Sequence, residues 1–302
     1  MTFTTQIKEE ITKEENNNIE DLTSLCTYLK FNATLEEDKM TVMVVNASVA
    51  RWIFKLLKTN YNVLIKLTTR TMKRFKARNL YILEVKEKLD LIYKDIDNIF
   101  KEISTSSDEE KKAFLKGMFL ACGSINDPKK NQYHLEFLVK EEDDAKLIDN
   151  LLNSLKIKSK VLKRDREYMV YVKSSDNISD FIKYLGAFNA LFYFEDIRIY
   201  KDHKNMVNRL NNCEQANVER TLKSSKTILD NIKYLEDNDL TILLDDRSKE
   251  IIEYKKKYPD TSLGELADII TMETNKSITK SGINHHFRKI NALVKKAKEN
   301  HE

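Results

Sequence analysis

The strongest chemical pattern in the sequence is a basic segment near its end. Between residues 275 and 298 there are seven Lys or Arg side chains and no Asp or Glu. Ile283, Phe287, Ile290 and Val294 recur at helical spacing, so they predict the buried face of a helix over residues 280–298. The polar and basic side chains around the rest of this helix are Lys280, Ser281, Asn284, His285, Arg288 and Lys289.

These side chains favour double-stranded DNA as a partner. The serine, amide, histidine and guanidinium groups lie in the first half of the helix, from which a helix in the major groove reaches base edges. The Lys side chains are suited to phosphates. The alternative interpretation is a solvated basic face on an ordinary helix.

The preceding residues predict the rest of a helix-turn-helix domain. Residues 245–258 predict a helix, and residues 262–270 predict a short helix with Ser262 as its N-cap. Either Ser277 or Thr279 would cap the last helix. A helix, a short helix, a turn and a final helix follow the plan of a helix-turn-helix domain.

A second basic segment occupies residues 66–78, with six Lys or Arg side chains and no acid. It spans a predicted strand and a hairpin tip. One interpretation is an exposed edge strand that charge protects from pairing with another chain. The other is a sheet surface that binds nucleic acid, through Lys66, Arg70, Lys73 and Arg74.

The sequence offers no recognisable set of catalytic residues. It has no Gly-rich phosphate loop, no HExxH, no Ser-His-Asp signature and no prominent pair of carboxylates. His285 and His286 would point about 100° apart on a helix, so they do not easily share one ion. Cys26, Cys122 and Cys213 are far apart and odd in number, which predicts reduced thiols. We therefore expect no catalytic residue, no metal and no cofactor.

Length and composition predict a soluble protein with little irregular structure. The chain has 302 residues, enough for about two domains, and only five Gly and two Pro. Its first residues are charged and lack the apolar core of a signal peptide. No apolar run approaches the ~20 residues that cross a membrane. We expect a cytoplasmic, nucleoid-associated protein without a membrane partner.

The first two-thirds of the chain repeat one order of elements. The first copy is predicted to consist of a helix at 19–32, a hairpin with a strand at 40–45, a helix at 48–57, strands at 62–69 and 79–85, and a helix at 89–100. The second consists of a helix at 109–121, a hairpin with a strand at 132–139, a helix at 143–155, strands at 158–162 and 168–172, and a helix at 178–185. A helix at 5–16 precedes the copies and a polar helix at 200–234 follows them.

This order predicts two antiparallel sheets related by a pseudo-twofold axis, with the two opening helices packed against each other. Asn32 in the first copy corresponds to Cys122 in the second, 90 residues later. Thr27 and Gly117 are small residues that would let the two backbones approach closely. Gly123 occupies the position where glycine commonly ends a helix.

The opening helices resemble a known motif. Residues 115–123, LKGMFLACG, are similar to the LAGLIDADG motif of homing endonucleases, and residues 25–33, LCTYLKFNA, are a more degenerate version. In those enzymes each motif helix ends with an acid that binds the catalytic metal. The matching positions here are Asn32 and Cys122, and an amide and a thiol are poor ligands for Mg²⁺. The resemblance implies an inherited fold without cleavage chemistry.

Four separated segments resemble the WhiA family of bacterial sporulation and cell-division transcription regulators. They are FTTQIKEEI, AFLKGMFLACGSINDPKKNQYHLEF, NRLNNCEQAN and SITKSGINHHFRKIN. The resemblance implies an α+β fold: a two-repeat LAGLIDADG homing-endonuclease-like domain (αββαββα twice) without nuclease activity, then an all-α helix-turn-helix domain similar to the promoter-reading domain of sigma factors. Ala33 stands in place of the usual glycine, and alanine tolerates the positive φ of a tight turn less well.

Together these features predict a sequence-specific DNA-binding transcription regulator linked to cell division, chromosome segregation and, in spore formers, sporulation. The expected partner is double-stranded DNA at promoter regions, with a protein partner of the N-terminal domain as a further candidate. The alternatives are a LAGLIDADG-type DNA endonuclease and a structural nucleoid or division protein. The predicted domains are the first repeat at 1–104, the second repeat at 105–200, a helical linker at 201–240 and the helix-turn-helix domain at 241–302.

Overall fold

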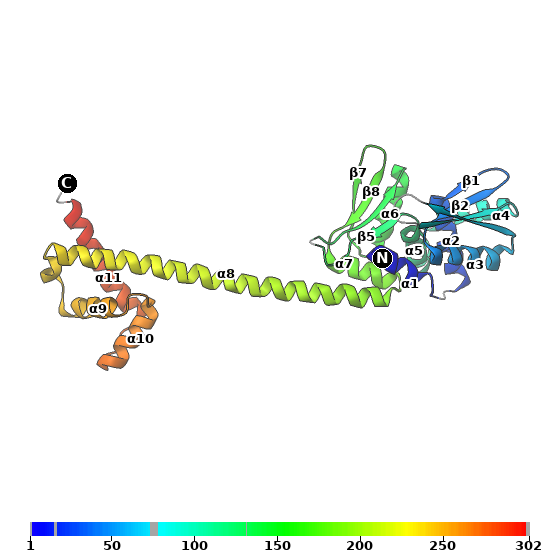
Figure 1. The fold of residues 1–302 in the computed structure, drawn as a ribbon. Coiled ribbons are helices and arrows are strands. Elements are labelled where there is room, and N and C mark those ends of the chain that lie inside the picture. Colours follow the sequence, from blue (N-terminus) through cyan, green and yellow to red (C-terminus); the bar gives the residue numbers. More distant parts are fainter. Residues whose placement is uncertain (1, 15–16, 73–77, 131, 300–302) are drawn as a thin grey trace. The chain divides into compact units, whose positions relative to one another are not determined.

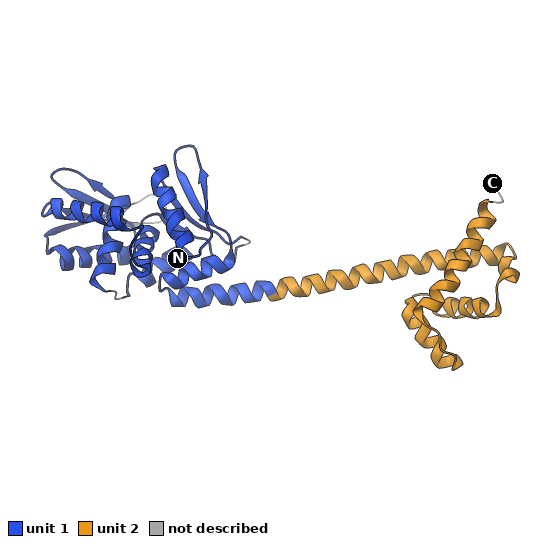
Figure 2. Ribbon diagram, turned by 180° about the vertical axis from the view of Figure 1, so that it is seen from behind, with its two compact units in different colours: residues 1–202 blue, residues 203–302 orange. Residues whose placement is uncertain are grey.

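A computed structural model of the chain describes residues 2–14, 17–72, 78–130 and 132–299 (Figure 1). The chain forms two compact units, residues 1–202 and residues 203–302 (Figure 2). The first unit contains helices and sheets, whereas the described part of the second unit is helical. The finer division into two repeats, a linker and a terminal domain stays a prediction.

The first unit contains the predicted order αββαββα twice (Figure 1). After α1 (Phe3–Ile11), the first copy consists of α2 (Asn18–Asn32), β1 (Ala33–Leu35), β2 (Met40–Val44), α3 (Ala47–Tyr61), β3 (Ile65–Met72), β4 (Arg78–Val85) and α4 (Leu89–Glu102). The second consists of α5 (Asp108–Cys122), β5 (Gly123–Ile125), β6 (Leu135–Val139), α6 (Glu142–Ser154), β7 (Lys160–Lys163), β8 (Tyr168–Val172) and α7 (Ser175–Tyr184).

The two copies build the same sheet. The described residues form two four-stranded sheets, ordered β1-β2-β4-β3 and β5-β6-β8-β7, and every pairing in them is antiparallel. The opening helices α2 and α5 end at Asn32 and Cys122, so the predicted offset of 90 residues is confirmed. The predicted α+β class and its internal repeat are therefore confirmed.

The opening helices α2 and α5 pack against each other at the centre of this unit. Seven consecutive residues of α2, from Thr23 to Leu29, are buried, as are eight of α5, from Ala113 to Leu120. A Cβ atom on Gly117 would lie 2.3 Å from the Ser24 carbonyl oxygen and 2.8 Å from the Thr27 Cβ. The predicted close approach at Thr27 and Gly117 is confirmed, and the cause is a helix backbone in contact with Gly117.

The ends of these helices differ from the predicted tight turn with positive φ, for which glycine is the suited residue. Gly123 is the C-cap of α5, but its φ is −82°, and Ala33, the C-cap of α2, has φ −93°. Both backbones are extended, so Ala33 is not strained by the loss of glycine. At Gly123 the constraint is space, because a Cβ there would lie 2.4 Å from Cδ2 of Phe119.

The long helix α8 (Phe188–Asp237) begins earlier than the predicted 200. Its first turn is capped by the Glu10 carboxylate, which accepts hydrogen bonds from the backbone N–H of Asn189 at 2.7 Å and of Ala190 at 3.1 Å. Glu10 lies about 180 residues away in sequence, so local sequence patterns cannot reveal this cap. The prediction for the first helix was also wrong at its end, since α1 stops at Ile11.

The second unit packs three helices against the C-terminal part of α8. After the 3₁₀ turn η1 (Leu240–Leu243) come α9 (Asp246–Lys257), α10 (Leu263–Thr274) and α11 (Lys280–Glu299). One apolar cluster holds them together, and its buried residues include Ile232, Leu235, Ile251, Leu266, Ile270, Ile283, Phe287 and Ile290. The predicted inward face of the last helix is confirmed, and the preceding helix ends at Thr274, four residues after the predicted end at 270.

The contact at Gly117 predicts a specific stability change. Gly117→Ala should lower the free energy of unfolding of the first unit by about 1–3 kcal/mol, because the overlap with the α2 backbone outweighs the gain in helix propensity. Urea unfolding followed by circular dichroism measures the change.

The matched control is Gly264→Ala in α10. The nearest atom to a Cβ there is the Ser262 Oγ at 3.8 Å, so the variant should be neutral or up to about 1 kcal/mol more stable. A Gly117→Ala protein as stable as the parent would contradict the close packing of α2 and α5.

Candidate nucleic-acid interface

The helices α10 and α11 are each fixed at their N-termini by side-chain caps. Ser262 and Glu265 form a reciprocal capping box at the start of α10. At α11 the Thr279 Oγ1 accepts a hydrogen bond from the Gly282 N–H at 3.2 Å, so Thr279 rather than Ser277 is the cap. Between the helices, Asn275 ends α10 in the left-handed conformation, with φ 54°. The structure thus contains the predicted helix, turn and final helix.

The predicted site residues of α11 all lie outside the buried face that Ile283, Phe287, Ile290 and Val294 form. Among them Lys280, Ser281, His285, Arg288 and Lys289 are exposed, and Asn284 is half-buried. In the part of the chain that the structure describes, no carboxylate lies within 4.0 Å of Lys280 or Arg288. Their positive charges are therefore available to an external anion.

Lys289 and His286 connect α11 to the start of α9. The Lys289 ammonium lies 3.6 Å from the Asp245 carboxylate. The Nδ1 of His286 lies 2.8 Å from the Ser248 Oγ and 3.8 Å from Asp245. Burial lowers the pKa of His286, and the Asp245 carboxylate opposes that shift.

From the sequence, His286 was considered only as half of a metal pair, and its contact with Ser248 was not predicted. His286 lies three residues after Ile283 and four before Ile290, so it flanks the buried face of α11. That spacing was the available signal, because a polar side chain beside an apolar stripe is placed to bond a neighbouring helix. Its partner in α9 fixes the orientation of α11 within the second unit.

The first part of the second predicted basic segment, residues 66–72, lies on β3, an edge strand of the first sheet. Lys66 is exposed and pairs across the sheet with Glu84, at 3.3 Å, and Arg70 is exposed. Lys73 and Arg74 lie outside the described residues. The edge position agrees with charge protection of an open strand, and DNA contact by this segment stays a prediction.

The motif positions hold neutral side chains. Asn32 is exposed, and its Nδ2 donates a hydrogen bond to the Tyr28 hydroxyl at 2.7 Å. The half-buried Cys122 thiol donates to the Met118 carbonyl oxygen at 3.5 Å. Burial raises the pKa of Cys122 to about 12, so the thiol is protonated at neutral pH. The described residues contain no cluster of three or more His, Cys, Asp or Glu side chains that would hold a metal ion.

A lysine lies at the end of α5, beside Cys122. The Nζ of Lys8, from α1, donates a hydrogen bond to the Leu120 carbonyl oxygen at 3.0 Å and lies 5.5 Å from the centre of the Phe119 ring. Burial lowers the pKa of Lys8 to about 8, while a charged Cys122 would raise it. The Lys8 amine thus satisfies the Leu120 carbonyl oxygen, one of the hydrogen-bond acceptors at the end of α5. When it is protonated, this amine would repel a metal cation.

Comparison with known proteins identifies the family. Models of the WhiA N-terminal LAGLIDADG-like domain, the WhiA LAGLIDADG-like domain and the WhiA C-terminal HTH domain match residues 19–99, 111–204 and 207–294. The probable cell division protein WhiA of Oceanobacillus iheyensis is 35% identical over 311 residues, which cover 99% of this chain and 98% of that protein. The chain belongs to the WhiA family. A second WhiA relative, from Bacillus cytotoxicus, is 36% identical over 98% of this chain and 97% of its own length.

Solved WhiA structures have the same fold. The crystal structure of full-length DUF199/WhiA from Thermatoga maritima matches with a TM-score of 0.59 and 22% identity, covering 98% of this chain and 99% of that one. The N-terminal LAGLIDADG domain of DUF199/WhiA matches with a TM-score of 0.52 and 20% identity, covering 61% of this chain and 90% of that one. Within the described residues, no helix has the length and apolarity of a membrane span.

Proposed function

We propose that this chain is a sequence-specific DNA-binding regulator of transcription that acts in cell division, chromosome segregation and, in spore formers, sporulation. The observation that carries the proposal is the exposed polar and basic face of α11, held in a helix-turn-helix unit. Membership of a family whose relatives are named as probable cell division proteins supports the biological role. DNA binding would place the protein at the nucleoid.

The roles of the α11 side chains follow from their positions. Asn284 and Arg288 are four residues apart and share one side of the helix, so both can reach neighbouring base pairs in a major groove. Ser281 and His285 belong to the same N-terminal half and would contact base edges or nearby phosphates. Lys280, at the first turn, has no acidic partner among the described residues and is suited to a phosphate.

Lys289 has a second role besides phosphate contact. It lies 3.6 Å from Asp245, the N-cap of α9, and both side chains are half exposed. A phosphate approaching α11 would compete with Asp245 for this ammonium, since a surface ion pair of this kind is weak. We therefore assign Lys289 to positioning as well as to non-specific attraction.

We further propose that the LAGLIDADG-like unit does not cleave DNA. Asn32 and Cys122 occupy the helix ends where the motif enzymes hold acids, and neither supplies a negative charge at neutral pH. Lys8 brings an amine to the Leu120 carbonyl at the same end of α5. A divalent cation would find a neutral amide, a protonated thiol and a neighbouring amine, which is an unfavourable set of ligands for Mg²⁺.

Whether the N-terminal unit binds DNA or a protein partner stays a prediction made from the sequence. It would contact DNA through Lys66, Arg70, Lys73 and Arg74, or it would bind a protein partner. Because Lys66 already pairs with Glu84, we expect its contribution to DNA affinity to be smaller than that of the unpaired Arg288.

The α11 assignment predicts distinct effects of two kinds of substitution. Arg288→Ala and Asn284→Ala should each weaken binding to target promoter DNA by about 1–3 kcal/mol and reduce its preference over random DNA. Lys280→Ala should weaken binding to promoter DNA and to random DNA equally, and it should lower the slope of log affinity against log salt by about 0.9. Gel shifts over a salt series measure these effects, on fragments enriched by chromatin immunoprecipitation of the intact chain.

Lys249→Ala is the control for the gel-shift series, because Lys249 is an exposed cation on α9 rather than α11. It should retain the parental preference for promoter DNA. Parental binding to both specific and random DNA by Arg288→Ala and Asn284→Ala together would disprove the recognition-helix assignment.

The proposal that the LAGLIDADG-like unit does not cleave DNA predicts that plasmid DNA stays intact. Supercoiled plasmid incubated with purified chain and Mg²⁺ or Mn²⁺ should stay supercoiled on an agarose gel, because the helix ends of α2 and α5 supply no metal-binding acid. Cys122→Ala is the matched variant. Nicking by the parent that disappears in Cys122→Ala would show that these helix ends are catalytic after all.

A further inference from the structure

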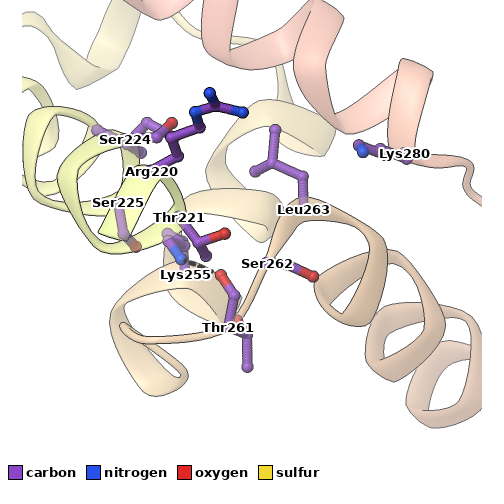
Figure 3. A pocket seen from close by; sticks show the side chains of 10 residues that line it. Arg220, Thr221, Ser224, Ser225, Lys255, Thr261, Ser262, Leu263 and Lys280 are labelled. Carbon is purple, nitrogen blue, oxygen red and sulfur yellow. Dashed lines mark hydrogen bonds between the residues drawn. The ribbon is translucent and has the colours of Figure 1, made fainter. Parts of the chain in front are cut away.

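A cavity of about 180 Å³, open to solvent, lies between the helices of the second unit, and its volume is well above the roughly 10–15 Å³ that one water molecule requires. Side chains from α8, α9, α10 and α11 surround it, together with the segment before α10 (Figure 3). Its lining residues are Arg220, Thr221, Ser224, Ser225, Ile228, Lys255, Thr261, Ser262, Leu263 and Lys280.

The charge of this lining is entirely positive. Arg220, Lys255 and Lys280 come from three different helices, and no Asp or Glu is among the described residues that line the cavity. Figure 3 shows Arg220 and Lys280 entering from opposite sides, one from α8 and one from the start of α11. Neither has a carboxylate within 4.0 Å among the described residues. The three cations therefore lack a counter-charge in the lining.

Lys255 is the most constrained of the three cations. Its side chain is 0% exposed, and its Nζ donates hydrogen bonds to the carbonyl oxygens of Pro259 at 2.9 Å and Thr261 at 2.8 Å. An ammonium group has three N–H donors, and the third has no partner among the described residues. Burial lowers the pKa of Lys255, whereas the carboxylates of Asp260 and Glu265, outside the lining, raise it. An anion in the cavity would favour the charged ammonium.

Two hydroxyl groups in the lining are also uncommitted. The described residues offer no hydrogen-bond partner to the Thr221 or Ser224 hydroxyl, whereas Ser225 donates to the Pro259 carbonyl oxygen. The N-terminus of α10 borders the cavity, but its capping box already satisfies that helix end. The unused donors in the cavity therefore belong to side chains.

We propose that this cavity binds a phosphate group. A phosphate oxygen accepts charge-assisted hydrogen bonds from Arg and Lys, and further bonds from hydroxyls. A cation would be repelled by the lining, and an apolar ligand would leave its donors unpaired. Because Lys280 is also the first residue of α11, the bound phosphate lies beside the proposed recognition helix.

Two sources supply this chemistry: a DNA backbone phosphate and a phosphorylated small molecule. Only the DNA source rests on the function proposed above. Binding of inorganic phosphate by itself does not require α11 to recognise DNA.

Titration of inorganic phosphate into the ¹⁵N-labelled full chain, in chloride buffer, tests the proposal. Amide signals of residues 220–225 and 261–264 should shift in a saturable manner. Arg220→Gln should bind phosphate about tenfold more weakly, because one charge-assisted contact is lost. Lys223→Gln is the matched control, since it removes the same charge from an exposed α8 residue outside the lining, and it should bind like the parent.

Promoter binding over a salt series then separates the two sources. If a DNA phosphate occupies the cavity, Arg220→Gln lowers the slope of log affinity against log salt by about 0.9, and inorganic phosphate competes with DNA. If the natural ligand is a small molecule, the slope is unchanged and the DNA-bound chain still binds inorganic phosphate. Either outcome supports a phosphate site.

The proposal is overturned if no saturable shift occurs around the cavity, or if Arg220→Gln and Lys223→Gln bind phosphate equally well. The Arg288→Ala variant keeps this result separate from the function proposed above. It should lose promoter preference while binding inorganic phosphate with parental affinity. Failure of either claim therefore leaves the other standing.

Discussion

The first unit depends on the close approach of α2 and α5 at Gly117. Nearly the whole middle of both helices is buried, and a single added carbon at Gly117 would overlap the α2 backbone at Ser24. Helices this close align the two αββαββα copies, so that β1 and β5 begin directly at the two helix ends. The repeat is therefore held by a backbone contact at its centre, and that contact restricts which residues are tolerated there.

The packing of α2 against α5 does not require the metal-binding acids of the LAGLIDADG motif that these helices resemble. The packing needs small and apolar residues along α2 and α5, and it places few demands on the last residue of each helix. Asn32 and Cys122 can thus replace acids without loss of the fold. The amine of Lys8 at the Leu120 carbonyl adds a contact that stabilises the helix end without a metal. In the proposed account, the unit serves as a scaffold and DNA recognition belongs to α11.

Sequence patterns predicted those features that depend on neighbours along the chain. Helical and strand periodicity identified the repeated order of elements, and the spacing of apolar residues identified the buried face of α11. Small residues identified the contact at Gly117. These predictions succeeded because each signal lies within a few residues of the element that it describes.

The features that were missed all join residues far apart in sequence. Glu10 caps α8 from about 180 residues away, and His286 bonds Ser248 in another helix. Arg220 and Lys255 line one cavity with Lys280 only after the four helices pack. The tight turn with positive φ that was expected at the helix ends was also wrong, because Ala33 and Gly123 are the first residues of the extended strands β1 and β5. At Gly123, the Phe119 side chain occupies the space that a Cβ atom would need. Steric limits of this kind depend on rotamers, which the sequence alone does not display.

Hydrogen–deuterium exchange of the full chain, with and without target promoter DNA, tests whether α11 is the element that recognises DNA. Exchange at residues 279–289 should slow on DNA binding, because these amides lie in the first turns of the proposed recognition helix. Exchange at residues 32–35 and 122–125, the ends of the motif helices, should not change. Protection at the motif ends with no change at 279–289 would disprove DNA recognition by α11, since it would place DNA on the LAGLIDADG-like unit instead.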